Sequence, residues 1–390
     1  MTAPKPRARG LGLPLLGTPG PWNAITDVPG VEVGFATLAE LAKTPGDTQI
    51  YTGVTAILPR GHNPRPLPVW AGQFDLNGNG EMTGTHWIRD AGYFIGPICL
   101  TNTHSVGIVH QAAVRFMIET YPQQFRAHHA WAMPIVAETY DGLVNDICGL
   151  HITEQHALQA LRGATAGAVA EGNVGGGAGM ATYEFKGGTG TSSRRFQIAG
   201  QTYTVGALVQ SNFGKRSEFS VLGVPVGRHI SENAILSDTG LPETGSIVVI
   251  IGTDVPLMPI QLKRLAKRGA LGIGRTGTSG GHYSGDLMLA FSVANPVYFP
   301  AIGEEQPRTY NAEWLNDAHC DELYGPTVSA IEEAILNALL AAQSVPTFKP
   351  AGLVLGALDH GRLLELLREY RRMPDRGTAK AGGARDDGVR

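Results

Sequence analysis

A serine at the boundary between a turn and a buried strand offers this sequence's clearest chemistry. Gly245-Ser246 ends a turn-rich segment, and the five β-branched residues of 247–251 follow at once. Such an apolar run bounded by glycines is typical of a fully buried strand. The Ser246 hydroxyl could attack the Gly245 carbonyl beside it. Cleavage there would leave Ser246 as a new N-terminus, whose α-amine has a pKa of about 8 and could act as general base.

The same residues are also typical of an ordinary turn with no catalytic role, because glycine and serine are favoured where turns enter strands. Other polar residues stand at predicted strand ends: Asn212 follows a strand over 201–210, and Ser284 and Asp286 precede one over 287–294. If these ends meet at one sheet edge, Ser284 could relay protons, Asp286 could hold its hydroxyl, and the Asn212 amide could donate to an oxyanion. Taken one at a time, each of these residues could instead have only a structural role, as a serine in a turn, a cap of a helix or strand, or an amide in a loop.

The elements that must position these residues form one mixed α/β domain, since strands and helices alternate without a repeat or a linker. We expect an extended arm over 1–22 and a disordered tail over 374–390. The predicted strands are 25–33, 51–58, 134–137, 195–199, 201–210, 246–252 and 287–294, and the predicted helices are 109–121, 153–170, 259–268, 328–343 and 360–372.

Composition excludes several classes of protein. With 43% apolar and 17% charged residues the chain is globular, and its net charge of −3 gives no reason to expect nucleic acid or a membrane surface as partner. No apolar run reaches about 18 residues, and the apolar stretch near the N-terminus is too short for a signal peptide. The cysteines Cys99, Cys148 and Cys320 are isolated. We therefore expect a cytoplasmic protein with reduced thiols.

Other motifs point to no cofactor. Gly272–Gly277 matches G-x-G-x-x-G, but the strand and helix that a dinucleotide site requires do not flank it. Gly175–Gly179 lacks the G-K-[ST] ending of a phosphate loop, which favours a close-packed loop. The histidines form no metal-ligand spacing, and no G-x-S-x-G elbow is present. We expect no metal and no organic cofactor.

Beyond these single motifs, a long ordered series of segments resembles the P1-type aminopeptidases, the family of the L-aminopeptidase/D-Ala-esterase/amidase DmpA and the β-peptidyl aminopeptidases. The resemblance spans about 24–345 and implies an N-terminal-nucleophile hydrolase with an αββα sandwich. It further implies an inactive precursor that cuts itself before a serine into α and β chains, which stay together in a homo-oligomer, often a tetramer. The segments are 25–30, 77–87, 100–107, 136–146, 172–179, 209–214, 245–256 and 272–286.

By position, the resemblance makes Ser246 the self-processing serine and later nucleophile, Ser284 and Asp286 its supporting pair, and Asn212 the oxyanion amide. Some relatives carry glutamate where Asp286 stands, so a shorter carboxylate could alter the relay. Glu138 and Tyr140 match a region lining the substrate pocket, where a carboxylate would suit a protonated amine.

We therefore expect a self-processing aminopeptidase, cut into chains 1–245 and 246–390, that hydrolyses amides, esters or short peptides with a free N-terminal amino acid. The sequence leaves open α-L, D-Ala or β-amino acyl substrates. Two alternatives remain: an acyltransferase of the ornithine-acetyltransferase type, whose members process at threonine, and a non-cleaving protein that binds a small ligand.

Overall fold

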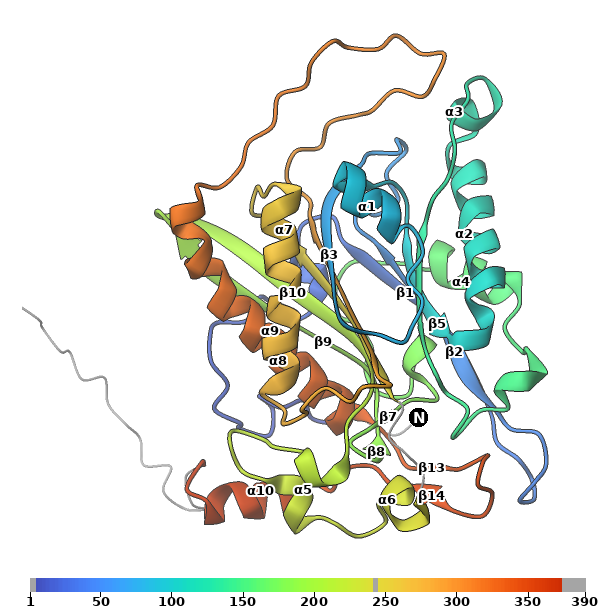
Figure 1. The fold of residues 1–390 in the computed structure, drawn as a ribbon, viewed down its shortest axis with the longest axis vertical. Helices are drawn as coiled ribbons and strands as arrows, with labels where there is room; N and C mark the ends of the chain where they lie inside the picture. The colour runs from blue at the N-terminus through green and yellow to red at the C-terminus, as the bar shows by residue number, and fades with distance from the viewer. Residues whose placement is uncertain (1–4, 241–244, 374–390) are drawn as a thin grey trace, which may run out of the picture.

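Two β-sheets packed face to face, with helices on both outer faces, form the centre of the molecule (Figure 1). The computed structural model describes residues 5–240 and 245–373. This arrangement confirms the expected αββα sandwich. The predicted tail over 374–390 lies outside the described residues.

The larger sheet carries the candidate chemistry. It has six strands in the order β4-β3-β12-β11-β10-β9. β11 and β12 run parallel, and the other neighbours are antiparallel. The strands are β3 (Val69–Gly78), β4 (Tyr93–Phe94), β9 (Gly188–Ile198), β10 (Gln201–Asn212), β11 (Ser246–Thr253) and β12 (Gly285–Ser292).

The smaller sheet lies across the core from it. Its four strands have the order β1-β2-β5-β6, and only β5 and β6 pair in parallel. They are β1 (Glu32–Glu40), β2 (Ile50–Leu58), β5 (Ile98–Asn102) and β6 (Ile135–Thr139).

The β-branched run after Ser246 explains why β11 is buried on both faces. Val248 and Ile250 point into the layer between the two sheets, whereas Ile247, Val249 and Ile251 belong to the core under the outer helices. Successive side chains of a strand point to opposite faces, so a continuous apolar run suits a strand covered on both sides.

Helices close the two outer faces. α7 and α9 cover the six-stranded sheet and α8 packs on α9, while α2 and α4 cover the four-stranded sheet. These helices are α2 (Val106–Thr120), α4 (Glu154–Arg162), α7 (Pro259–Ala266), α8 (Arg268–Gly274) and α9 (Cys320–Ala341). None of the helices in the described ranges is long and apolar enough to cross a membrane.

The described residues also form shorter helices, strand pairs and 3-10 turns outside these two sheets and their covering helices. They are the α-helices α1 (Thr85–Ala91), α3 (Pro122–Arg126), α5 (Val226–His229), α6 (Ile235–Thr239) and α10 (His360–Glu369), the strand pairs β7 (Ala181–Thr182) with β8 (Phe185–Lys186) and β13 (Val345–Pro346) with β14 (Val354–Leu355), and six 3-10 turns at Ile25–Asp27, Thr103–Ser105, Ile147–Gly149, Gly175–Gly177, Arg216–Glu218 and Asp317–His319.

Several predicted segments differ from the structure. The strand predicted over 195–199 begins at Gly188, and the helix predicted over 328–343 begins at Cys320. A 3-10 turn occupies Ile25–Asp27, and the first strand begins only at Glu32, because Pro29-Gly30 makes a turn between them. The helix predicted over 153–170 ends at Arg162, where Gly163 follows. The helix predicted over 259–268 ends at Ala266, and a second helix that was not predicted, α8, occupies Arg268–Gly274.

The glycine-rich loop before β7 is close-packed, as its sequence predicts. A Cβ atom on Gly176 would lie 2.6 Å from the Leu100 carbonyl oxygen of β5 and 2.1 Å from the Gln210 side chain of β10. Its backbone therefore fits between one strand of each sheet, where no larger residue has room.

Residues 5–22 contain neither helix nor strand and run along β9 and α9. Arg9 pairs with the fully buried Glu333 of α9 at 2.9 Å, and Arg194 of β9 reaches the same carboxylate at 2.7 Å. Arg7 pairs with Glu171 at 2.7 Å. These ion pairs fix the segment to the sandwich.

Candidate active site

The strand register brings the predicted site residues to one edge of the six-stranded sheet. Asn212, the last residue of β10, lies opposite Ser246, the first residue of β11. On the other side Ser246 lies beside Gly285, the first residue of β12, with Ser284 and Asp286 on either side of it in sequence. Four residues expected at strand ends therefore meet at a single edge.

Ser246 is nearly buried, with 5% of its surface exposed. Its Oγ accepts a hydrogen bond from the Gly285 amide at 3.1 Å, and the same amide donates to the Gly245 carbonyl oxygen at 3.3 Å. One N–H thus polarises the carbonyl before Ser246 and touches the hydroxyl beside it. A Cβ on Gly285 would lie 2.3 Å from the Asn79 carbonyl oxygen, so only glycine lets this amide approach.

Ser284 and Asp286 form a buried pair next to Ser246. The Ser284 hydroxyl donates to Asp286 Oδ1 at 2.6 Å, and Asn77 Nδ2 of β3 donates to Asp286 Oδ2 at 2.9 Å. A bulge between Asp286 and Leu287 shifts the β3–β12 register at this point. Asp286 reaches the Ser284 hydroxyl two residues before it in the same segment, and each carboxylate oxygen has a donor.

The Asn212 amide is held in one orientation. Its Oδ1 accepts from the Ala181 amide at 2.8 Å, and its Nδ2 donates to the Tyr140 carbonyl oxygen at 2.9 Å. Because a backbone N–H fixes the oxygen, the NH₂ group must face the other way, towards the Tyr140 backbone. An amide fixed in this way is pre-organised to donate.

Glu138 lies at the end of β6 and is almost fully buried. Its carboxylate accepts from the Glu81 amide at 3.0 Å and from the Thr103 hydroxyl. Burial raises the pKa of Glu138, and these two hydrogen bonds oppose the rise. A positive charge reaching this carboxylate would therefore be strongly favoured.

Gly80 lies between Glu138 and the edge of the six-stranded sheet that carries Asn212, Ser246, Ser284 and Asp286. We call this edge the serine edge. A Cβ on Gly80 would lie 3.3 Å from Glu138 Oε1 and 3.6 Å from the Gly285 Cα, so the carboxylate and the Gly285 amide flank the same residue. Tyr140, two residues after Glu138, is half-exposed, and burial of its ring raises its pKa. The structure thus brings Glu138 to the site, with Tyr140 contributing its carbonyl to Asn212.

Asn77, Glu81, Thr103 and the Gly285 amide have roles at this site that were not predicted from the sequence. Asn77 and Glu81 stand in the glycine- and asparagine-rich stretch after the apolar part of β3, and polar residues in that position were the available signal. Their partners, Asp286 and Glu138, are far away in the sequence, so only the folded register identifies the contacts. Within the described ranges, no group of three or more His, Cys, Asp or Glu side chains could hold a metal ion.

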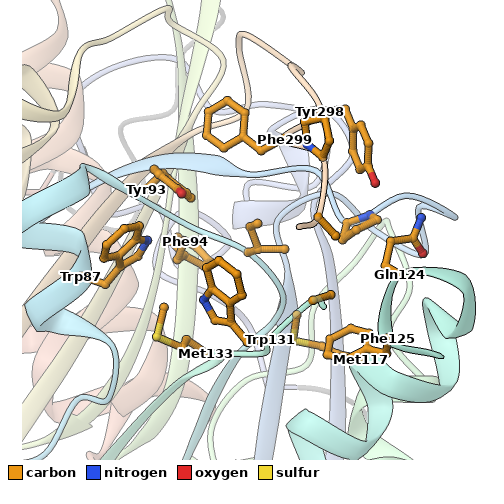
Figure 2. Close-up of a pocket in the computed structure, with 15 residues that line it drawn as sticks. Trp87, Tyr93, Phe94, Met117, Gln124, Phe125, Trp131, Met133, Tyr298 and Phe299 are labelled. Carbon is orange, nitrogen blue, oxygen red and sulfur yellow. The ribbon is translucent and has the colours of Figure 1, made fainter. Parts of the chain in front are cut away.

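A separate apolar cavity of about 110 Å³ lies at the opposite end of β5 and β6 from Glu138 (Figure 2). It opens between the segment around α3 and the loop that follows β12, and none of the serine-edge residues lines it. Figure 2 shows the aromatic side chains of this wall, among them Trp87, Tyr93, Trp131 and Phe299, gathered around a common space. Its wall includes Trp87, Tyr93, Phe94, Met117, Gln124, Phe125, Trp131, Met133, Tyr298 and Phe299.

Known proteins share both the sequence and the fold. Residues 23–351 match Peptidase family S58. The beta-peptidyl aminopeptidase BapA of Sphingosinicella microcystinivorans is 45% identical over 385 residues, which cover 95% of this chain and 94% of that protein.

Two solved structures agree with this relationship. The L-aminopeptidase D-Ala-esterase/amidase of Ochrobactrum anthropi, described as a prototype of the serine aminopeptidases and a variant of the Ntn hydrolase fold, superposes with a TM-score of 0.89 at 48% identity, covering 95% of this chain and all of that one. A beta-aminopeptidase of Burkholderia sp. gives a TM-score of 0.85 at 45% identity, with 94% and 100% covered.

The fold and the serine edge together are those of an N-terminal-nucleophile hydrolase. More narrowly, the chain belongs to peptidase family S58. The expected class of enzyme, an aminopeptidase, is confirmed, and it is favoured over the acyltransferase and binding-protein alternatives.

Proposed function

We propose that the chain is a precursor that cuts itself between Gly245 and Ser246. The Ser246 Oγ attacks the Gly245 carbonyl carbon, the peptide nitrogen leaves as the Ser246 α-amine, and the acyl group is held as an ester. Water then hydrolyses the ester and releases chains 1–245 and 246–390. The observation that carries this proposal is the Gly285 amide, which donates to both the Gly245 oxygen at 3.3 Å and Ser246 Oγ at 3.1 Å.

In the mature enzyme, the freed α-amine of Ser246 takes the proton from its own hydroxyl as general base. The hydroxyl attacks the acyl carbon of the substrate, and an acyl-enzyme forms that water clears. The Asn212 amide and the Gly285 amide donate to the oxyanion, while Asp286 orients the Ser284 hydroxyl beside the nucleophile. Their support is the shared sheet edge and the fixed orientation of the Asn212 amide.

The substrates in this proposal are amides, esters and short peptides with a free N-terminal amine. Glu138 supports that requirement, because its buried carboxylate accepts from the Glu81 amide and the Thr103 hydroxyl, and no Lys or Arg of the described residues forms an ion pair with it. A substrate ammonium would supply the missing positive charge. α-L, D-Ala and β-amino acyl p-nitroanilides are the panel to compare, since a beta-peptidyl aminopeptidase and an L-aminopeptidase D-Ala-esterase/amidase are 45% and 48% identical to this chain.

Intact mass measurement of the purified protein under denaturing conditions tests the processing step. We expect two chains that meet at Gly245/Ser246, and a Ser246→Ala control that stays at the full 41.3 kDa and turns over no substrate. A parent chain that remains at full mass after long incubation contradicts the proposal.

The mature protein is proposed to form a homo-oligomer, a tetramer of αβ pairs. Large apolar side chains on the segment after α3 and on the loop after β12 support an interface, since Trp131, Ile302 and Trp314 are each more than half exposed. The two segments meet at the His129–Ile302 bridge. Sedimentation equilibrium at micromolar concentration should give a multiple of the αβ mass, and a single αβ pair at all concentrations would contradict it.

The proposed location is the cytoplasm. Cys99, Cys148 and Cys320 are free thiols, as a reducing compartment would keep them. Thiol labelling after cell fractionation should find the protein, with all its thiols reduced, in the cytoplasmic fraction; recovery with the secreted proteins would contradict this.

A further inference from the structure

A short helix that precedes the proposed cleavage point in the sequence, α6, is held by the buried carboxylate of Glu184, which lies outside the helix. α6 begins after Ala234, whose side chain makes no cap hydrogen bond. In its place, Glu184 Oε2 accepts from the Ser237 amide at 2.9 Å, and Glu184 Oε1 accepts from the Ser237 hydroxyl at 2.8 Å. A residue of another element therefore satisfies a donor that the first turn of this helix leaves open.

Glu184 stands at the tip of a strained two-residue turn. Tyr183 and Glu184 join β7 to β8, and their φ angles are +51° and +59°. Turns with two left-handed residues favour asparagine and glycine, because other side chains are disfavoured there. A buried glutamate in this turn needs contacts that hold it in place, and its bonds to Ser237 and to the Arg216 amide at 3.0 Å provide them.

Arg216 binds the chain a few residues before α6, at Ile230 and Glu232. Its Nη1 donates at 3.0 Å to the carbonyl oxygens of both Ile230 and Glu232, and its Nη2 donates at 2.6 Å to the Glu184 carbonyl oxygen. Burial lowers the pKa of Arg216 to about 10, and the charge of Glu184 is the largest influence opposing that shift. The chain around α6 is thus held at two places. Ser237 binds Glu184 directly, and Ile230 and Glu232 bind Arg216, which in turn binds the Glu184 carbonyl oxygen.

The other contacts of this hairpin lead to the serine edge. The Ala181 amide at its base holds Asn212 Oδ1, and the Tyr183 amide donates to the Phe213 carbonyl oxygen at 2.7 Å. The Tyr183 hydroxyl shares a 2.7 Å hydrogen bond with Thr276, on the segment leading to Ser284. The β7–β8 hairpin therefore connects the frame of the site with the helix that precedes Gly245.

We propose that Glu184 is a positioning residue for self-processing: by anchoring α6 to the β7–β8 hairpin, it holds the chain before Gly245 so that the Gly245 carbonyl stays on the Gly285 amide, within reach of the Ser246 hydroxyl. The inference rests on the proposed cleavage and assigns Glu184 to that step alone. After the cut, α6 belongs to the end of chain 1–245, and turnover at Ser246 no longer depends on how that end is presented.

The test follows processing and turnover separately. The precursor is made by cell-free synthesis, its conversion is timed on denaturing gels, and p-nitroanilide turnover is expressed per cleaved chain. Glu184→Gln keeps the shape but turns one acceptor into a donor that faces N–H groups, so processing should slow by about tenfold. Turnover per cleaved chain should stay within about twofold of the parent.

Ser237→Ala provides a second variant that leaves the core intact, since Ser237 is exposed. It removes only the hydroxyl bond, so processing should slow by about threefold. In the double variant the effects should not multiply, because both changes act on one contact. The matched control is Thr239→Ala, whose hydroxyl bonds within α6 to the Ile235 carbonyl oxygen and should leave processing at the parent rate.

The outcomes separate this inference from the proposed function. A parent that is never cut overturns both. A parent cut between Gly245 and Ser246, beside Glu184→Gln and Ser237→Ala variants cut equally fast, overturns this inference alone. So does a turnover per cleaved chain that falls as much as the processing rate.

Discussion

In the Ser284–Asp286 pair, exchanging a single oxygen atom of the carboxylate for an NH₂ group should have a large effect on turnover. Each oxygen of Asp286 accepts from one partner, Ser284 on one side and Asn77 on the other. Asp286→Asn would place an NH₂ group against one of these donors and release the Ser284 hydroxyl from its orientation. We expect kcat per cleaved chain to fall by about a hundredfold, with a smaller change in KM.

Asp75→Asn is the matched control for that measurement. Asp75 is an exposed carboxylate on β3, two residues before Asn77, and it lies opposite Leu287. Its neutralisation should leave kcat within about twofold. Equal losses in the two variants would show that charge near β12, rather than the orientation of Ser284, governs turnover.

The raised pKa of Glu138 predicts an acid limb in substrate binding. As pH falls through that raised pKa, the carboxylate gains a proton and loses its attraction for the substrate ammonium, so kcat/KM should fall. Glu138→Gln should remove this contribution, leaving the acid limb of the Ser246 α-amine, and raise KM about tenfold at neutral pH. A pH profile of kcat/KM for parent and variant measures both effects, and identical profiles would contradict the assignment.

The raised pKa of the Glu138 carboxyl also predicts how the free energy of unfolding changes with pH. Since the folded chain binds this proton more tightly than the unfolded chain, Glu138 lowers the free energy of unfolding as pH rises from 4.5 through the raised pKa. On a Ser246→Ala background, Glu138→Gln should therefore gain stability relative to the parent with rising pH. Urea titrations at acidic and neutral pH would contradict this if the difference did not change.

Sequence reasoning at this scale found the residues that stand at strand ends and missed those whose role depends on register. Ser246, Asn212, Ser284 and Asp286 could be predicted because glycine, turn and apolar patterns mark the ends of strands. Asn77 carries the same kind of signal, but its contact with Asp286 arises only through a bulge between strands that lie more than 200 residues apart in the chain.

At the scale of elements, glycines set how closely the helices cover the sheets. A Cβ on Gly190 of β9 would lie 2.0 Å from the Ala334 carbonyl oxygen of α9. Gly190→Ala must therefore push the helix away from the sheet, and we expect the free energy of unfolding to fall by about 2 kcal/mol, measured in urea on the Ser246→Ala background.

Gly274→Ala is the control for this change. Gly274 ends α8, and a Cβ there would meet nothing within 4 Å. Alanine in a helix should be neutral or stabilising by up to about 1 kcal/mol. If the two variants were equally stable, the close approach of α9 to β9 would not limit the packing.

The predicted elements were most accurate where periodicity was long and least accurate at their ends. The apolar runs of β2, β11 and β12 and the long helix α9 could be located from the sequence alone. The boundaries of α4 and β1 were wrong, because Gly163 and Pro29-Gly30 outweigh the apolar spacing around them. α8 was missed because three of its residues are glycines, of which two are needed for packing: a Cβ on Gly269 would lie 2.5 Å from the Met288 side chain, and one on Gly272 would lie 2.6 Å from the Ile331 side chain of α9.

At the scale of the molecule, the proposed cut would divide the chain but not the sandwich. In the six-stranded sheet β12 and β11 come from 246–390, and they lie between β3 and β10 of 1–245. α9 belongs to the second chain, yet it covers β9 of the first, with Glu333 paired to Arg194 and Arg9. The four-stranded sheet lies wholly within 1–245, but neither product holds the complete six-stranded sheet or either of the cores on its two faces.

We therefore expect the two chains to stay together after processing. Separation would break the ladders on both sides of the β11–β12 pair and expose the apolar layers on both of its faces, as in dividing a domain core. Native mass spectrometry should show only assemblies in which each copy weighs 41.3 kDa plus one water, and urea should unfold both chains in one transition. Chains that separate in native buffer, or that unfold in two steps, would mean that the interleaved strands do not act as one cooperative core.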